Sequence, residues 1–227
     1  MLGKKGKLFS VEGPDTAGKS TQVELLKKAL EEKGERAEII HFPDYYSPYG
    51  QLIASFLRAD RDRPMDYNEA YALQLLYIAD QQAAQTRIRK MLDEGIHVIL
   101  DRYDISTMVY TAATLSQTEE GRRVLEDPMT IIRIVSCCQS ELMFPTVTFV
   151  LDLPAEEIKK RKAILDRFES NEPLMKFIAE LYQNIGTTEK YLFERQIIHV
   201  DAMKSVKEVH EEILNVIESR YLKASVL

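Results

Sequence analysis

Residues 13–21 of this chain, Gly-Pro-Asp-Thr-Ala-Gly-Lys-Ser-Thr, constrain its fold more than any other stretch. They fit G-x-x-x-x-G-K-[ST], a pattern typical of loops that hold nucleotide phosphates. The glycines let backbone N–H groups curl around phosphate oxygens, and the helix that follows presents its positive N-terminal end to them. Lys19 can reach the outer phosphates, and the Ser20 hydroxyl can bind magnesium. The stretch predicts a nucleoside triphosphate site made by Gly13, Pro14, Asp15, Thr16, Ala17, Gly18, Lys19, Ser20 and Thr21.

The residues on either side of this loop have the order that the pattern requires. Residues 7–11 are a short apolar run, which predicts a buried strand before the loop. After the loop, Val23, Leu26 and Leu30 recur at helical spacing, and Gly34 is a typical helix stop. Strand, loop and helix therefore follow one another as in a phosphate-binding unit.

Apolar strand-like runs alternate with helical patterns along the rest of the chain. Alternation of this kind indicates a parallel sheet with helices on both faces, in which ligands bind beyond the carboxyl ends of the strands. The further predicted strands are 37–42, 96–100, 147–151 and 197–200, and the clearest predicted helices are 67–92, 171–193 and 205–220. Ser205 and Glu208 form a capping-box pattern at the start of the last helix.

Composition indicates a single water-soluble α/β domain spanning residues 1–227. The net charge of −6 argues against nucleic acid as a sequence-independent partner. No apolar run approaches the ~20 residues that span a bilayer, so we expect no membrane partner. Cys137 and Cys138 are adjacent and indicate reduced thiols, which favours a cytoplasmic location.

Charged residues follow two of the predicted strands. Asp101 and Arg102 come directly after strand 96–100, where a carboxylate can orient magnesium and an arginine can hold a phosphate through two hydrogen bonds. After the fourth strand, basic residues gather at 159–162 and again at Arg167. They can be the solvated end of a helix, or a basic segment that covers a transferring phosphoryl group.

Taken together, these motifs resemble the thymidylate kinase family of P-loop nucleoside monophosphate kinases over nearly the whole chain. The resemblance implies an α/β, three-layer P-loop kinase fold with a five-stranded parallel sheet in the order 2-3-1-4-5 and a short basic lid at about 159–171. The matching segments are 9–15, 18–21, Phe42-Pro43 with Gly50 and Ile53, Leu76–Asp80, Asp101-Arg102-Tyr103 with Ser106 and Tyr110, Asp166–Glu169 and Val200–Ala202.

The resemblance also implies an activity and a role for each matching residue. It implies transfer of the γ-phosphoryl group of ATP to dTMP, with Mg²⁺ as cofactor, in a cytoplasmic homodimer. Lys19, Asp15, Arg102, Arg161 and Arg167 would be catalytic, and Ser20 with Asp101 would serve the metal. The substrate-binding residues would be Asp15, Phe42, Tyr45, Tyr77, Gln81, Arg102, Ser106 and Tyr110.

Three positions depart from the family pattern. Thr16 stands where some members have an arginine, so the lid would have to supply that cation. Asp44, Tyr45 and Tyr46 replace the usual arginine after Phe42-Pro43, so a tyrosine hydroxyl would contact the phosphate there. Gln81 stands where the family has an arginine that helps to read thymine, which leaves base preference open.

Two other functions remain open from the residues alone. A deoxynucleoside kinase also has a phosphate loop and a basic lid, but it needs a carboxylate base, for which Asp44 is the candidate. A kinase of different or broader base specificity would fit the change at Gln81. A nucleotide-dependent switch is less favoured, since the sequence has no N-K-x-D-like guanine reader.

Overall fold

The computed structural model of the chain describes residues 5–58, 65–124, 126, 139, 141–161, 172–186 and 195–222. The chain forms two compact units. The first comprises Met1–Ile40, Ile88–Asp101 and Phe144–Leu227, and the second comprises His41–Arg87 and Arg102–Met143. Among the helices described in these ranges, none combines the length and apolar character needed to cross a membrane.

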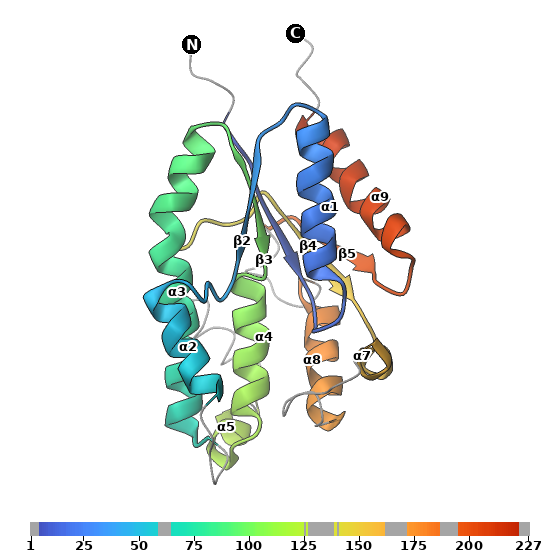
Figure 1. Cartoon of the computed structure of the whole chain (residues 1–227). Helices are drawn as coiled ribbons and strands as arrows, with labels where there is room; N and C mark the ends of the chain where they lie inside the picture. The colour runs from blue at the N-terminus through green and yellow to red at the C-terminus, as the bar shows by residue number, and fades with distance from the viewer. Residues whose placement is uncertain are drawn as a thin grey trace. The chain divides into compact units, whose positions relative to one another are not determined.

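A five-stranded parallel sheet is the centre of the first unit, and its strands follow the order β2-β3-β1-β4-β5 (Figure 1). This order confirms the one that the sequence resemblance implied. The strands are β1 (Leu8–Glu12), β2 (Ala37–His41), β3 (His97–Asp101), β4 (Val147–Asp152) and β5 (Ile197–Asp201). Each lies within about one residue of its predicted range.

The three central strands carry almost no exposed residue. All residues of β1 and β3 are buried, as are the first five of β4, whereas the edge strands β2 and β5 are partly exposed. Continuous burial is typical of parallel strands that are covered on both faces. In the parallel register Val11 lies opposite Asp101, so the phosphate loop and the end of β3 leave the sheet at the same level.

Helices α1 (Lys19–Glu32) and α9 (Val206–Ile217) lie side by side against this sheet (Figure 1). Val23, Leu26 and Leu30 are fully buried on α1, as their helical spacing predicts. Gly34 has φ 79° just beyond the helix, a conformation that glycine adopts without strain. The helix therefore ends where the sequence indicated.

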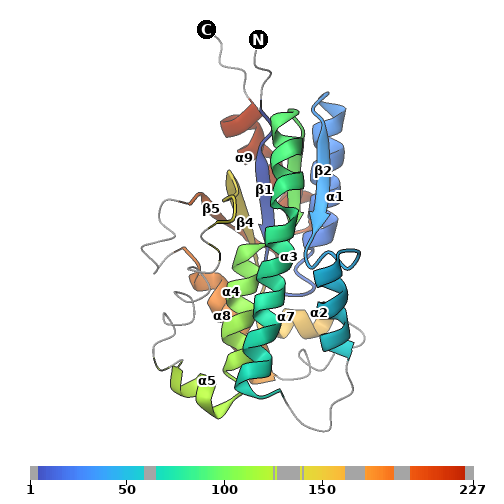
Figure 2. The ribbon, with the colours of Figure 1, turned by 90° about the vertical axis from the view of Figure 1, so that its left-hand side faces the viewer.

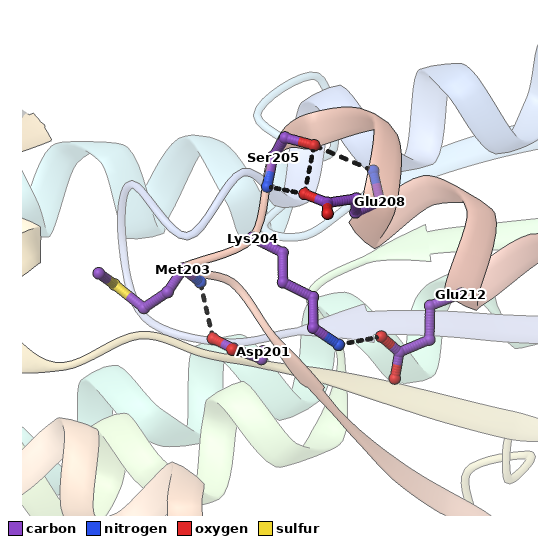
Figure 3. Close-up of polar contacts among 6 residues, drawn as sticks. All are labelled: Asp201, Met203, Lys204, Ser205, Glu208 and Glu212. Atoms are coloured by element: carbon purple, nitrogen blue, oxygen red, sulfur yellow. Dashed lines mark hydrogen bonds and ion pairs between the residues drawn. The ribbon is translucent and has the colours of Figure 1, made fainter.

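The predicted capping box at the start of α9 is present (Figure 3). The Ser205 hydroxyl accepts a hydrogen bond from the Glu208 N–H, and the Glu208 carboxylate accepts one from the Ser205 N–H. These two bonds satisfy backbone donors that a helix start otherwise leaves without partners. A π-helical segment, η2 (Glu218–Leu222), continues from the end of α9.

The predicted helix at 171–193 is shorter than expected. It forms α8 (Glu172–Asn184), which packs against β4 and is followed by a turn with Gly186 at φ 77°. The rest of that prediction falls on residues 187–194, outside the described residues. The short helix α7 (Ala155–Arg161) precedes the equally undescribed 162–171, which hold Arg167 and most of the expected lid.

The second unit is helical. Its described helices are α2 (Pro48–Arg58), α4 (Asp104–Leu115), α5 (Glu119–Val124) and the greater part of α3 (Tyr67–Asp93), whose last turns belong to the first unit. The sequence predicted α3 almost to the residue. Helices α3 and α4 run beside each other (Figure 2).

The imidazole of His199 links three elements of the first unit. Its Nδ1 lies 3.0 Å from both carboxylate oxygens of Asp152, and its Nε2 lies 2.9 Å from the carbonyl oxygen of Ile185. A neutral imidazole has one N–H, so bonding to both acceptors requires the protonated ring. The hydrogen bond to Asp152 raises the pKa of His199, which favours this form. His199 thus ties β5 to the end of β4 and to the turn after α8.

Replacing His199 by glutamine is expected to lower the free energy of unfolding by about 1–2 kcal/mol at about pH 6, and by less at about pH 9. The pKa is raised in the folded state, so the stabilisation is complete below the ordinary value of 6.5 and disappears as the pH rises through the folded-state pKa. Urea unfolding at the two pH values measures the difference.

His210 on α9 provides a control of opposite sign. Burial lowers the pKa of His210, so its contribution to stability falls as the pH falls. The stability difference between wild type and His210→Gln should therefore shrink toward acid pH. An equal loss of stability at both pH values in His199→Gln would contradict a protonated His199 that bonds to both Asp152 and Ile185.

Candidate active site

The phosphate loop of the first unit connects β1 to α1 by way of two glycines in conformations that other residues avoid. Gly13 has φ 140°, and a Cβ atom there would lie 2.7 Å from the carbonyl oxygen of Leu151 in β4. Gly18 has φ 94° and is the N-cap of α1. Only glycine fits both requirements, because it lacks a Cβ and tolerates positive φ. The sequence pattern therefore sets the backbone path that surrounds a phosphate.

The ammonium group of Lys19 is held over this loop. Its Nζ donates a hydrogen bond of 2.6 Å to the carbonyl oxygen of Pro14, and the residue is 6% exposed. Lys19 is the first residue of α1, whose N-terminal end attracts anions. The loop thus places a cation beside a helix start, as binding of a triphosphate requires.

Two expected magnesium-site residues, Ser20 and Asp101, are in direct contact. The Ser20 hydroxyl donates to Asp101 Oδ2 at 2.6 Å. Ser20 lies in the first turn of α1, and Asp101 is the last residue of β3. Hydroxyl and carboxylate oxygens suit Mg²⁺, which binds few protein ligands beside substrate phosphates and water. The described residues contain no cluster of three or more His, Cys, Asp or Glu side chains that could hold a metal alone.

Arg161, one of the expected lid cations, lies at the C-terminal end of α7. Its guanidinium donates a 2.8 Å hydrogen bond to the carbonyl oxygen of Ala202, the residue after β5. The turn that follows is fixed by a hydrogen bond from the Met203 N–H to Asp201 and by the ion pair of Lys204 with Glu212 (Figure 3). Arg161 is therefore attached to the loop after β5 in this structure.

In the second unit, three expected substrate-binding residues lie together at the start of α4: Arg102 just before the helix, and Ser106 and Tyr110 on it. Nη1 of Arg102 lies 3.3 Å from the Ser106 hydroxyl, and its guanidinium carbon lies 5.3 Å from the centre of the Tyr110 ring. Ser106 and Tyr110 are spaced by four, which brings their side chains to one face of α4. Arg102 also has φ 66°, a backbone conformation that costs a non-glycine residue about 1–3 kcal/mol and that gathers at functional sites.

The aromatic residues expected near the substrate differ in exposure. Phe42 is 5% exposed, and its ring centre lies 5.6 Å from that of Tyr103. Tyr45 is 50% exposed, while Tyr77 on α3 is partly exposed. Phe42 thus belongs to the core of the unit, whereas Tyr45 and Tyr77 are accessible to a ligand. Asp44, the alternative candidate base, accepts a hydrogen bond from the Tyr46 N–H within its own turn.

Gln81 belongs to a buried polar ladder between α3 and α4 that the sequence analysis missed. Its amide nitrogen donates to the Thr107 hydroxyl at 2.8 Å, and that hydroxyl lies 3.3 Å from the Tyr103 carbonyl oxygen. Among the described residues, Gln81 Oε1 has no hydrogen-bond donor. Further rungs join Thr111 to Gln74 at 3.0 Å and Gln85 to the Tyr103 hydroxyl at 2.9 Å.

The signal for this ladder is present in the sequence. Gln74, Gln81 and Gln85 are spaced by seven and four, which places three amides on one face of a helix. Their partners are Thr111, Thr107 and Tyr103, in that order. These residues are spaced by four and run in the opposite direction along the chain, so α3 and the segment 103–111 are antiparallel. The spacing alone does not predict which helix carries the hydrogen-bond partners of these glutamines.

Comparison with known proteins identifies the chain. A protein family described as Thymidylate kinase matches residues 11–213, most of the sequence. The chain belongs to the thymidylate kinase family. It is 28% identical to a thymidylate kinase of Homo sapiens over 94% of this chain and 90% of that protein. It is 30% identical to a thymidylate kinase of Chlorobaculum tepidum over 96% of this chain and all of that protein.

The fold agrees with a solved member of the thymidylate kinase family. The structure of thymidylate kinase from Candida albicans superposes with a TM-score of 0.76 at 28% identity, over 95% of this chain and 92% of that one. Broad substrate specificity is ascribed to the Candida albicans enzyme. The P-loop kinase architecture expected from the sequence is therefore confirmed at the level of the whole fold.

Replacing Lys19 by alanine is expected to lower phosphoryl transfer at least about 100-fold, because the ammonium group can stabilise charge on the transferring phosphates. Coupled measurement of ADP formation with ATP and dTMP tests this, and thermal unfolding checks the fold. Lys28→Ala is the matched control, since Lys28 is an exposed α1 lysine paired with Glu32. Near-normal turnover in Lys19→Ala would show that the loop assignment is wrong.

Proposed function

We propose that this chain transfers the γ-phosphoryl group of ATP to dTMP, giving dTDP and ADP for dTTP synthesis. The observation that carries this proposal is the thymidylate kinase match over residues 11–213, which includes both the phosphate loop and the Arg102 cluster. It is supported by the names of the relatives, which are thymidylate kinases from vertebrates, a protist and bacteria.

The first unit supplies the ATP side of the proposed reaction. Residues 13–21 bind the triphosphate, and Lys19 neutralises the outer phosphates. The oxygen donors of Ser20 and Asp101 fit Mg²⁺, either directly or through water, because their side chains meet at 2.6 Å. When bound there with ATP, the metal would offset negative charge on the phosphates. Arg161 and Arg167 are the lid cations, within a lid at about 159–171.

The second unit supplies the dTMP side. Arg102 binds the monophosphate, and the side chains of Ser106 and Tyr110, on α4, lie against its guanidinium group. Tyr77 stacks on the base, while Tyr110 crowds the position of a ribose 2′-hydroxyl. Phe42, Tyr45 and Gln81 complete the substrate-binding set, and Asp15 from the phosphate loop accepts the sugar 3′-hydroxyl.

The reaction needs no general base, since the acceptor is already a phosphate oxyanion. Phosphoryl transfer then depends on positioning the two phosphates and on cations that match the charge of the transition state. We further propose that residues 1–227 act as one catalytic domain, in a cytoplasmic homodimer, as the family resemblance implies.

Replacing Arg161 by alanine is expected to lower kcat by about 100-fold and to change KM for ATP much less, because the cation is needed mainly in the transition state. Steady-state kinetics with varied ATP measure both constants. Lys204→Ala is the control, since Lys204 carries a cation near the same loop but is paired with Glu212. A loss confined to KM for ATP would make Arg161 an ordinary binding residue.

Substrate choice tests the acceptor assignment. We expect dTMP to be the best substrate, followed by dUMP, with purine monophosphates poor and UMP rejected more strongly than dUMP. One methyl group is worth only about 1–3 kcal/mol in a pocket, so the preference over dUMP should be modest. Gln81→Arg should sharpen the preference for dTMP. Equal turnover of dCMP or dGMP and dTMP would retain the kinase assignment and refute the thymidylate assignment.

A further inference from the structure

Residues 42–47 join β2 to α2 and contain two of the expected substrate-binding residues, Phe42 and Tyr45. Between β2 and α2 these residues form neither strand nor helix. Without backbone pairing to a sheet, the path of this substrate loop depends on contacts with neighbouring side chains. The loop and every residue discussed below lie in the second unit.

The carboxylate of Asp80, on α3, holds the substrate loop at two points. Asp80 Oδ2 accepts a 2.7 Å hydrogen bond from the backbone N–H of Asp44. Asp80 Oδ1 accepts a 2.5 Å hydrogen bond from the Ser47 hydroxyl. Asp80 is 2% exposed, so little solvent competes for either bond.

Ser47 extends the hold of Asp80 to the start of α2. Its hydroxyl oxygen accepts a 2.8 Å hydrogen bond from the Gly50 N–H, and its own N–H donates to the Asp44 carbonyl oxygen at 2.8 Å. The hydroxyl thus donates its single proton to Asp80 and accepts from Gly50, which leaves one lone pair that can accept from a further donor. Gly50 has no room for a side chain, because a Cβ atom there would lie 1.9 Å from the Asp44 carbonyl oxygen.

Burial of the ionised Asp80 side chain has a cost in stability. Desolvation raises its pKa, partly offset by the hydrogen bonds from Ser47 and Asp44, and the nearby Asp44 carboxylate raises it further. A carboxyl group whose pKa is raised in the folded state costs stability when it is ionised at neutral pH. A neutral side chain would avoid this cost, so the position favours a role other than packing.

We propose that Asp80 is a positioning residue for the acceptor nucleotide: through Asp44 and Ser47 it fixes the loop that presents Phe42 and Tyr45. This inference rests on the proposed function, since it takes a nucleoside monophosphate as the acceptor. The next residue, Gln81, bonds to Thr107 on α4. Two consecutive residues of α3 thus fix the loop and the α4 helix, which carries Ser106 and Tyr110 and begins just after Arg102.

Kinetics of Asp80 variants test the positioning role. Asp80→Leu should raise KM for dTMP about tenfold or more, with KM for ATP and kcat changed little, because loosening the loop affects binding of the acceptor. Asp80→Asn should stay close to wild type, since its amide oxygen can accept from the Asp44 N–H and its NH₂ can donate to the Ser47 hydroxyl. Ser47→Ala should show the same selective effect as Asp80→Leu, and it tests the proposal if the leucine variant does not fold.

Hydrogen exchange provides a readout that is independent of turnover. The amides of Asp44 and Gly50 should exchange faster in Asp80→Leu than in wild type, while Asp80→Asn should retain their protection. Faster exchange with an unchanged KM for dTMP would overturn the positioning role. So would an equal rise in KM in Asp80→Asn, because charge rather than loop geometry would then matter.

A failure of the proposed function would give a different result. If wild type does not phosphorylate dTMP but phosphorylates another nucleoside monophosphate, the thymidylate assignment fails. The KM comparison is then made with that acceptor, and it decides the role of Asp80. If wild type phosphorylates no monophosphate, both proposals are wrong, even if hydrogen exchange at Asp44 and Gly50 shows that Asp80 holds the loop.

Discussion

The parallel pairing of β1 with β3 is the constraint on which the ATP side of this structure depends. It sets Val11 opposite Asp101, so the phosphate loop after β1 begins at the same level of the sheet as the Asp101 carboxylate at the end of β3. The Ser20 hydroxyl donates a 2.6 Å hydrogen bond to Asp101 there. Ligands of parallel sheets bind at this edge because loops and helix N-termini converge there. The chemistry of Ser20 and Asp101 is thus a consequence of strand register, which hydrophobic burial of the central strands maintains.

The second unit depends on buried polar contacts rather than on strand pairing. On helix α3, Gln74, Gln81 and Gln85 bond to residues of α4 and to Tyr103, the N-cap of that helix. Asp80, also on α3, bonds to the substrate loop. Hydrogen bonds in a dry interior depend strongly on geometry, so they fix one relative placement of their partners where apolar contacts would tolerate several. Except for Asp15 of the phosphate loop, the residues expected to bind dTMP lie on or next to these elements.

Regular elements were predictable from the sequence where hydrophobic spacing and glycine positions agree. The strands, α1, α3 and the capping box of α9 follow such local rules, and the sheet order followed from the family resemblance. Helix α4 has no comparable pattern: it is buried along almost its whole length, so it shows no polar face to mark its period. The hydrogen bonds of Asp80 to the substrate loop were not predictable from the sequence, for a different reason. They join residues 33 and 36 positions apart, and no local pattern identifies such partners.

The change from the family's arginine to Gln81 has a physical consequence for base recognition. Arginine only donates hydrogen bonds and carries a charge that must be offset when it is buried. In this structure the Gln81 NH₂ donates to Thr107, whose own hydroxyl proton is directed to the Tyr103 carbonyl oxygen. The orientation of the amide is therefore set by α4, and its oxygen Oε1 is an acceptor that has no donor among the described residues. An acceptor at this position would favour a base that offers an N–H group over one that offers a carbonyl oxygen. Reading thymine through its N–H rather than through a carbonyl would retain dTMP as a substrate while relaxing the discrimination that an arginine provides.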